Sequence, residues 1–578
     1  QPTYDAPPTA QTLRNAVPRR GLNRRIVRMI KALFVFALVV GLLSLIYNFF
    51  ALKEQMQGIK QILNTGNKGV IQTAMEDTAQ ASIVVVGGGL AGLAAAIEAL
   101  QQTQGTKADV VMVEKEPRTG GNSAKASSGI NGAWTDTQKV QGITDSTEAF
   151  ENDTLRSGRG LSNGTLVKRL TQESAQSVAW LQSHFSLDLD IIAQLGGHSA
   201  ARTHRRPDTA DGRPQPVGWG IVSTLAARLS DQPRFRLVSE AQVVELIKDT
   251  RTSTSGVEGV VYKTIDGKLH RLRASAVVLA TGGFAGDGGA ANGLLHKFTP
   301  QLASLPSTNG KFATGDGVKL GMAIGADLVG MEHVQVHPTG FVSPADPTAP
   351  TKFLAAEALR GAGGLLLNGK GERFVNELDT RDNVTDAINA ACSSTSTRAG
   401  YPDADANGPA AFLVLSQAAA DAFGHGALGF YEKMRLINRA TGISGLAAAM
   451  RVPLATLSKT LFSHDDVRSS GSVDEFGKKT FPQPALNADQ TSLYFWAVVT
   501  PSIHYTMGGL RFDEKARVLQ AGNQSPIPGL FAAGEVTGGL HGANRLAGNS
   551  LLECVVFGRE AGRQAALTAL KTINEGKL

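Results

Sequence analysis

The stretch Ser82-Ile83-Val84-Val85-Val86-Gly87-Gly88-Gly89-Leu90-Ala91-Gly92 decides the fold of this chain. Its first half is a short apolar run, typical of a buried strand in a parallel sheet. Its glycines follow the pattern G-x-G-x-x-G and lead into an Ala-rich stretch, 93–100, that favours a helix. Gly87 permits a tight turn, Gly89 lets the backbone approach a pyrophosphate, and Gly92 lets the helix pack against the sheet. Free N–H groups at the start of such a helix bind phosphate.

A second strand and an acidic residue follow at the expected distance. The run 109–113 is mostly apolar and is followed by Glu114, 22 residues after Gly92. An acid at that place accepts hydrogen bonds from ribose hydroxyls. The glycine pattern alone could arise by chance in a chain with 65 glycines. Because strand, turn, helix, second strand and acid occur in order, the sequence predicts a dinucleotide site.

Two later strands favour FAD over NAD as the dinucleotide. The runs 276–280 and 530–533 are apolar and each leads into a glycine turn, and the second begins about 440 residues after the first glycines. A chain that returns to its opening fold near its C-terminus resembles the flavoproteins with two dinucleotide-binding domains. We therefore expect an α/β FAD fold of that class with an inserted α+β capping domain.

Further motifs carry a closer resemblance, which covers residues 81–578. The segment 120–131 (GGNSAKASSGIN) is similar to the second flavin loop of the fumarate reductase and succinate dehydrogenase flavoproteins. The other motifs of that family follow in its order: 337–340 (HPTG), 357–361 (EALRG), 376–382 (NELDTRD), 504–509 (HYTMGG) and 542–553 (GANRLAGNSLLE). The likeness is greatest to the soluble eukaryotic fumarate reductases of yeast and trypanosomatid type.

The resemblance implies how FAD is held. Asn122 stands where the respiratory-complex flavoproteins carry a His that bonds covalently to FAD. We therefore expect noncovalent FAD, which favours fumarate reduction over succinate oxidation. The residues expected to contact the cofactor are Gly87, Gly89, Gly92, Glu114, Lys115, Asn122, Ser123, Ser128, Gly129, Thr281, Gly282, Asp316, Glu535, Ser550 and Leu551.

The resemblance also assigns the substrate contacts. Fumarate is a small dianion, and its reduction requires a hydride at one carbon, a proton at the other, and donors that hold both carboxylates. His337 is expected to hold one carboxylate, and His504 with Arg545 the other. Without the motifs, a single His is more often an ordinary surface or core residue.

Three further residues are implied in proton transfer. Arg381 is the expected proton donor, and Glu357 and Arg360 are expected to relay protons to it from solvent. Arginine is a weak acid, with a pKa above about 12, but a carbanion-like transition state is basic enough to accept its proton. The simpler alternative is that both arginines are ordinary salt-bridge partners of Glu357 and Glu377.

Other residues near these motifs carry weaker signals. Arg373 is close to Arg381 in sequence but stands outside the acid's motif position, so we expect a structural role. His198 and His204 are either ordinary residues or local contacts to the flavin or between domains. Ala356 replaces the Thr that many bacterial relatives carry before the motif's Glu, which removes one hydroxyl contact to the substrate.

The N-terminal region predicts a membrane anchor. Residues 1–31 carry seven basic residues and one acid, and 32–52 contain no charge over 21 residues. A helix of that length spans about 30 Å, the hydrocarbon thickness of a bilayer. A signal peptide or a buried core helix is the alternative, although a signal's apolar region is shorter. The positive-inside tendency places the body opposite the basic tail, and we expect the mitochondrial inner membrane.

Charge and cysteine content exclude other classes. The net charge is +7, of which the tail supplies +6, so a nucleic-acid partner is not expected. Two cysteines cannot hold an iron–sulfur cluster, and no metal site is expected. Because the chain shows no electron-input module, we expect a membrane-bound electron donor or complex partner. The chain begins with Gln1, which a removed organelle-targeting peptide or a truncated sequence would each explain.

The expected organisation follows from these assignments. The predicted parts are a basic tail 1–31, a transmembrane helix 32–52, a linker 53–80, an FAD-binding domain 81–331 and 506–578, and a capping domain 332–505. The function we expect is reduction of fumarate to succinate. Two alternatives remain open: an FAD-binding accessory subunit of a membrane complex, and a flavin-dependent reductase of another enoate.

Overall fold

The computed structural model describes residues 76–576, except 211–214, 250–255, 289, 291, 393–407, 482–485 and 487–488. The predicted tail 1–31 and span 32–52 lie outside these residues. Among the helices of the described ranges, none is both long enough and apolar enough to cross a membrane. The membrane anchor therefore stays a prediction.

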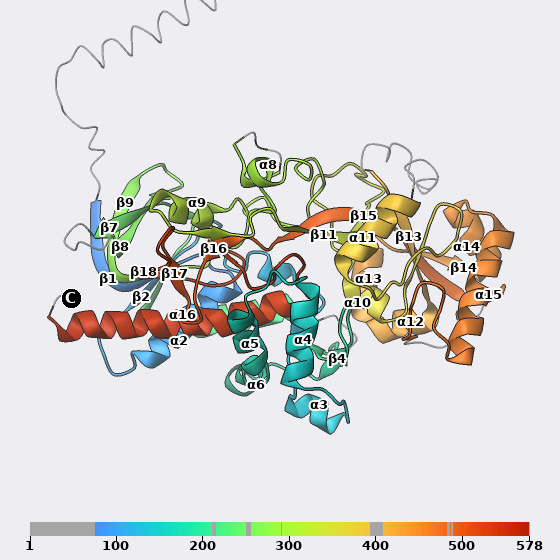
Figure 1. Cartoon of the computed structure of the whole chain (residues 1–578), viewed down its shortest axis with the longest axis horizontal. Helices are drawn as coiled ribbons and strands as arrows, with labels where there is room; N and C mark the ends of the chain where they lie inside the picture. The colour runs from blue at the N-terminus through green and yellow to red at the C-terminus, as the bar shows by residue number, and fades with distance from the viewer. Residues whose placement is uncertain are drawn as a thin grey trace, which may run out of the picture. The chain divides into compact units, whose positions relative to one another are not determined.

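A parallel sheet forms around the opening stretch (Figure 1). β1 (Glu76–Val86) runs parallel to β2 (Val110–Val113) on one side and to β9 (Leu269–Leu279) on the other. β6 (Phe235–Val238) continues the sheet beyond β2, and β18 (Pro526–Ala532) pairs in parallel with β9. The strand predicted near the C-terminus thus joins the sheet that the first strand opens.

β1 begins earlier than the sequence predicted. Residues 76–80 were expected to belong to a linker, but the strand starts at Glu76. β9 begins at Leu269, and its first residues pair with β1 back to Glu76. Pairing with a long neighbour extends the strand, and the polar composition of 76–80 does not reveal that neighbour.

Two helices cover one face of the sheet and pack closely on each other (Figure 1). They are α2 (Leu90–Gln102) and α16 (Asn549–Asn574). A Cβ atom at Gly558 or Gly562 would lie 2.6 or 2.2 Å from a backbone carbonyl oxygen of α2. The two helices can approach this closely only because α16 carries glycine at both contacts.

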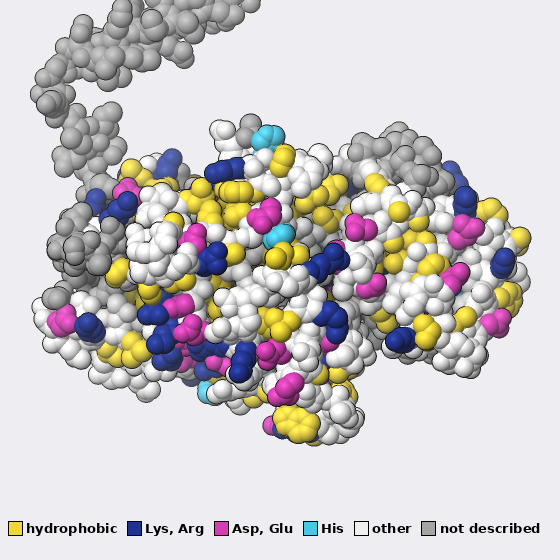
Figure 2. Space-filling model, in the orientation of Figure 1, with side chains coloured by type: hydrophobic (Ala, Val, Ile, Leu, Met, Phe, Trp, Pro, Cys, Tyr) yellow, Lys and Arg dark blue, Asp and Glu magenta, His cyan; other side chains and the backbone are white. Residues whose placement is uncertain are grey.

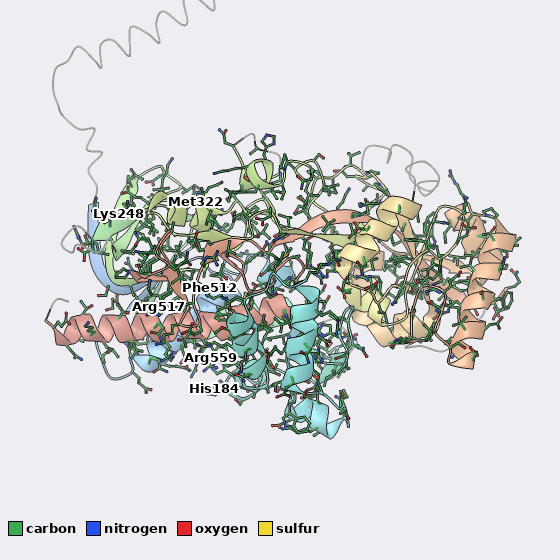
Figure 3. The ribbon with its side chains drawn as sticks, viewed as in Figure 1. His184, Lys248, Met322, Phe512, Arg517 and Arg559 are labelled. Atoms are coloured by element: carbon green, nitrogen blue, oxygen red, sulfur yellow. The ribbon has the colours of Figure 1, made fainter. Side chains whose placement is uncertain are left out.

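Side chains on both sides of α16 add to this packing (Figure 3). Arg559 donates a 2.9 Å hydrogen bond to Glu98 of α2. Phe557 packs edge-to-face on Phe512, with ring centroids 5.1 Å apart. The C-terminal helix is therefore fixed to the sheet, and its N-terminus, at Asn549, is held beside the first glycine turn.

The remaining elements around this sheet are short. A hairpin of β7 (Ala241–Asp249) and β8 (Gly256–Thr264) joins the edge of β9. The others are η1 Ser123–Lys125, β3 Ile130–Asn131, α3 Asp136–Val140, α4 Thr147–Ser157, α5 Gly164–Gln172, α6 Ser174–Phe185, β4 Ile191–Ala193, β5 Thr203–Arg205, α7 Val217–Ser230, α8 Leu294–Phe298, α9 Asp316–Ala323, β10 Leu328–Val329, β16 Gly509–Arg511, β17 Arg517–Leu519 and β19 Thr537–Gly538.

A second, antiparallel sheet is built on β15 (Leu493–Thr506). β15 pairs with β11 (Val334–Phe341) and β13 (Ala411–Ser416), and β12 (Leu365–Leu367) and β14 (Asn438–Thr441) complete the sheet. Its helices are α10 Glu357–Gly361, α11 Arg381–Ala391, α12 Gln417–Phe423, α13 His425–Lys433, α14 Gly442–Met450 and α15 Leu454–Ser470. The limits of a capping domain at 332 and 505 stay predictions.

The surface of the described region carries mixed charges. On the face in Figure 2, Lys and Arg side chains are interspersed with Asp and Glu. This arrangement agrees with the sequence, in which residues 81–578 carry a net charge of only about +1.

The α2–α16 contact predicts opposite effects for the same substitution at two helical glycines. Gly562→Ala should destabilise the protein by about 1–3 kcal/mol, because the new methyl group overlaps α2. Gly445→Ala in α14, where no atom lies within 4 Å of the added Cβ, should stabilise by about 0.5–1 kcal/mol through helix propensity. Thermal unfolding of both variants checks this, and a shift of equal sign in both would contradict it.

Candidate active site

The glycine turn brings backbone very close to backbone. Gly87 has a φ of +102°, and a Cβ atom there would lie 2.5 Å from the carbonyl oxygen of Ala280 at the end of β9. A Cβ atom at Gly92 would lie 2.0 Å from the carbonyl oxygen of Gly87. Glu114 accepts a 2.6 Å hydrogen bond from the N–H of Gly88, and burial raises the pKa of its carboxyl. The turn thus leaves the N-terminus of α2 open to a cavity.

This cavity lies where the ends of β1, β2, β9 and β18 meet α2 and α16. Gly92 lies behind its wall, at the helix contact. The other residues predicted to bind the cofactor all line it: Gly87, Gly89, Glu114, Lys115, Asn122, Ser123, Ser128, Gly129, Thr281, Gly282, Asp316, Glu535, Ser550 and Leu551. Segments that lie far apart in the described chain therefore share one cavity.

A charged pair closes the cavity near Glu114. Lys115 Nζ lies 2.9 Å from Asp316 Oδ2 and 3.0 Å from the Thr314 hydroxyl. Burial alone would raise the pKa of Asp316, but the hydrogen bond from Thr314 and the charge of Lys115 outweigh burial and lower it. Asp316 is therefore charged and can accept hydrogen bonds at this end.

The sequence missed several residues of the cavity wall. Asn122 is bonded to Asn309, and its Oδ1 accepts the N–H of Gly310 at 3.0 Å. Nothing in the sequence marked the loop around Asn309. Tyr505 and Glu553 also line the cavity. Both stand inside motifs, but no role had been assigned to them.

A buried row of two arginines around one carboxylate lies beside the cavity. Arg381 Nε is 2.7 Å from Glu357 Oε2, and Arg360 approaches the same oxygen at 3.7 Å. Glu357 Oε1 accepts the N–H of Gly196 at 2.8 Å. Burial would raise the pKa of Glu357, but the two arginines outweigh it and the pKa is lowered. The carboxylate is therefore ionised between two cations.

The row has an inner and an outer end. Arg381 is the first residue of α11 and lines the cavity, where it also donates to Gln335 Oε1 at 2.8 Å. Glu357 and Arg360 lie on α10, behind Arg381. Arg360 donates to the backbone carbonyl of Glu377 at 2.5 Å and does not pair with its carboxylate. Glu357 is therefore a salt-bridge partner of both arginines, whereas the Glu377 carboxylate pairs with neither of them.

Two histidines stand next to Arg381. The rings of His337, on β11, and His504, on β15, lie 5.0 Å apart, centroid to centroid. His337 Nδ1 accepts the N–H of Thr339 at 3.2 Å, so the neutral ring carries its proton on Nε2. Burial, followed by the charge of Arg381, holds the pKa of both histidines well below 6.5. His337 Nε2 is buried and has no partner among the described residues, so it can donate to a ligand.

Arg545 completes the group. Its side chain is buried, it lines the cavity, and its Nε has no partner in the described part of the chain. Burial, reinforced by Arg381, lowers its pKa to about 10, so the guanidinium stays charged at neutral pH. His504 is fixed by a 2.7 Å hydrogen bond between its Nδ1 and the Thr308 hydroxyl.

Three residues with weaker signals have structural partners. Arg373 makes bonds of 2.8 and 2.9 Å to the carboxylate of Glu377, which agrees with the structural role expected for it. His198 bonds to the Ala547 carbonyl at 2.9 Å, between the segment before β5 and the loop before α16. His204 bonds to Thr135 at 2.8 Å and does not line the cavity. In the described ranges, no group of three or more His, Cys, Asp or Glu could hold a metal ion.

Comparison with known proteins agrees with this geometry. Residues 82–551 match the FAD binding domain family. The chain is 40% identical over 496 residues to fumarate reductase 1 of Saccharomyces cerevisiae, covering 84% of this chain and 98% of that protein. It is 39% identical over 491 residues to fumarate reductase of Schizosaccharomyces pombe, covering 84% and 90%. The open conformation of a flavocytochrome c3 fumarate reductase matches with a TM-score of 0.64 at 32% identity, covering 86% of this chain and 79% of that one.

The fold and the site define an FAD-dependent oxidoreductase of the α/β flavoprotein class. Within that class the chain belongs to the fumarate reductase family, in the superfamily of fumarate reductase and succinate dehydrogenase flavoproteins. The family resemblance and FAD as cofactor are thereby confirmed. The roles of the individual site residues stay predictions.

The Gly87 turn predicts a selective loss of cofactor. Gly87→Ala should abolish or strongly reduce FAD binding, because the position has a positive φ and the new Cβ would overlap the Ala280 carbonyl. Gly164→Ala, at the start of α5 with no atom within 4 Å of the added Cβ, is the control. Flavin per protein, measured after acid release, should fall only in the first variant. Full flavin content in Gly87→Ala would contradict the assignment.

Proposed function

We propose that this flavoprotein reduces fumarate to succinate. The observation that carries the proposal is a set of four donors beside the FAD cavity: buried His337, Arg381 and Arg545, and half-buried His504. Both histidines are neutral donors, and both arginines are charged. A planar dianion with a carboxylate at each end matches such a set, since each carboxylate meets charge-assisted hydrogen bonds of about 1.5–3 kcal/mol.

The charges of the site need a dianion. Arg360, Arg381 and Arg545 are buried. Among the described residues, Glu357 is the carboxylate within 4.0 Å of these arginines, and it pairs with Arg360 and Arg381. Burying positive charge is costly, so a dicarboxylate that binds among these arginines would offset part of that cost. Bound FAD, when reduced, supplies the hydride for the double bond.

The position of Arg381 supports a role as the proton donor. It is the member of the Arg360–Glu357–Arg381 row that lines the cavity. Loss of a proton from its guanidinium to the substrate carbon would leave a neutral arginine 2.7 Å from Glu357. Glu357 can then pass on a proton received from the Arg360 side. Because proton and hydride add to opposite carbons, the arginine balances the charge that develops on the substrate.

Substitution of Arg381 separates binding from proton delivery. Arg381→Gln should lower kcat by about 10²–10⁴-fold, the usual contribution of a general acid. Arg381→Lys keeps the positive charge, so KM for fumarate should change less than kcat. The measurement is fumarate-dependent oxidation of a reduced dye by FAD-loaded protein. Arg439→Gln, at an exposed arginine of β14, is the matched control and should be fully active.

The results also distinguish the alternatives. If the FAD-loaded wild-type protein does not oxidise the dye with fumarate, other enoates are tested next, and Ala356 provides the reason. This residue is buried and has no hydroxyl, so the contact to a substrate carboxylate that a Thr would make is missing. Failure with every enoate would favour an accessory subunit. Full activity of Arg381→Gln would remove Arg381 as the acid.

FAD is proposed to bind noncovalently. Asn122 stands in the second flavin loop, and its side-chain amide is not a nucleophile that could bond to the flavin. The amide is hydrogen-bonded to Asn309 and Gly310. Acid precipitation should therefore release all of the flavin. A protein whose flavin potential is not raised by a covalent bond favours reduction of fumarate.

We further propose that residues 32–52 anchor the protein in a membrane, with mitochondrial inner membrane as the location, and that a membrane-bound donor supplies electrons. The 21 uncharged residues after a basic tail support this. The full chain should stay with membranes through alkaline carbonate extraction, and a chain lacking residues 1–52 should be released. Release of the full chain would contradict the anchor.

A further inference from the structure

Arg545 is a buried cation without a carboxylate of its own. No Asp or Glu of the described residues lies within 4.0 Å of its guanidinium, which donates a 3.4 Å hydrogen bond from Nη1 to the Leu546 carbonyl. An isolated buried charge is unfavourable unless its surroundings compensate it. The proposed role as a carboxylate clamp also requires that the guanidinium be held in place before the substrate arrives.

The aromatic ring of Tyr505 lies against this guanidinium. The central carbon of Arg545 is 4.4 Å from the ring centroid, well within the range of a cation–π interaction. Both side chains are buried, and desolvation strengthens such an interaction. The Nε of Arg545 has no partner among the described residues and can donate to a ligand in the cavity.

Glu553 fixes this ring from the opposite end. The Tyr505 hydroxyl donates to Glu553 Oε1, and His541 Nε2 lies 2.7 Å from Glu553 Oε2. Both carboxylate oxygens are therefore occupied by donors. Burial, followed by the charge of Glu553, holds the pKa of Tyr505 well above 10, so the phenol keeps its proton and remains the donor.

The neighbours of Tyr505 are tied in the same way. His504 is bonded to Thr308, and Thr506 donates from its backbone and its hydroxyl to Glu535 at 2.9 and 3.1 Å. Glu535 is a second carboxylate near Arg545, but its bonds go to Thr506 and none reaches the Tyr505 ring. Among the described residues, Glu553 is the carboxylate that is linked to Arg545 through the ring.

We propose that Tyr505 and Glu553 are positioning residues for Arg545. The Tyr505 ring supports the guanidinium, and the Glu553 carboxylate, held by His541, fixes the ring and supplies the negative charge that Arg545 lacks. This inference rests on the proposed role of Arg545 in binding a dicarboxylate. It assigns a function to the glutamate at the end of the motif 542–553, which the reaction itself does not use.

The test is dicarboxylate binding and turnover in three variants of the FAD-loaded full chain. Tyr505→Leu removes the ring, Tyr505→Phe keeps the ring but loses the bond to Glu553, and Glu553→Gln removes the charge. Because Arg545 contacts a carboxylate in ground and transition states alike, KM for fumarate should rise with little change in kcat. We expect about a 10-fold rise for Tyr505→Leu and Glu553→Gln, and about 3-fold for Tyr505→Phe.

A double-mutant cycle shows whether the effect passes through Arg545. Affinity for succinate is measured from the change it causes in the flavin absorbance of the oxidised protein. In an Arg545→Lys background, Tyr505→Phe should weaken succinate binding no further, because the guanidinium that the ring supports is gone. Additive losses would mean that Tyr505 acts by another route, and the proposal would be overturned.

Controls separate this outcome from folding and from failure of the proposed function. Glu560→Gln alters another buried glutamate of α16, bonded to Arg169 and Arg563, and should leave KM unchanged. Reoxidation of the reduced flavin by ferricyanide, which needs no carboxylate site, should be equal in all variants. If wild type binds and reduces fumarate while Tyr505→Phe and any FAD-loaded Glu553→Gln match it, the positioning role is wrong. If wild type shows neither, the proposed function itself fails.

Discussion

The ion pair between Glu357 and Arg381 is the contact on which the site depends. Glu357 lies on α10 and Arg381 begins α11, and the 2.7 Å bond between them holds the arginine at the cavity wall. The second oxygen of Glu357 accepts from Gly196, which belongs to the segment before β5. One buried carboxylate therefore ties two helices near the antiparallel sheet to a loop on the side of the parallel sheet. Loss of Glu357 would leave the buried Arg381 without its ionic partner. It would also remove one contact between elements of the two sheets.

Two carboxylates compensate the buried arginines in different ways. Glu357 stands behind Arg381, and Glu553 stands behind the Tyr505 ring that contacts Arg545. Glu357 bonds to the Nε of Arg381, whereas neither carboxylate bonds directly to Arg545 among the described residues. This arrangement reduces the cost of burying the arginines. A direct salt bridge to Arg545 would satisfy its guanidinium within the protein and leave less of it for a substrate.

Local sequence signals predicted the sheet and the cofactor cavity well. The strands around 82–86, 276–279 and 530–532 have apolar runs next to glycine turns, and 110–113 is an apolar run followed by Glu114, so each is visible without its neighbours. The helix contact through Gly558 and Gly562 and the extension of β1 to Glu76 were not predicted. Both depend on which element lies opposite, and that information is not local.

The active-site residues show the same division more sharply. Six residues were assigned because they stand in family motifs, and the structure gathers them beside one cavity: His337, Glu357, Arg360, Arg381, His504 and Arg545. Asn309 carried no motif and was missed, although it is bonded to Asn122. Tyr505 and Glu553 are 48 residues apart, so neither motif could reveal that one supports the other. A motif names the residues that a reaction uses, whereas the residues that hold them in position become visible only when distant segments are folded together.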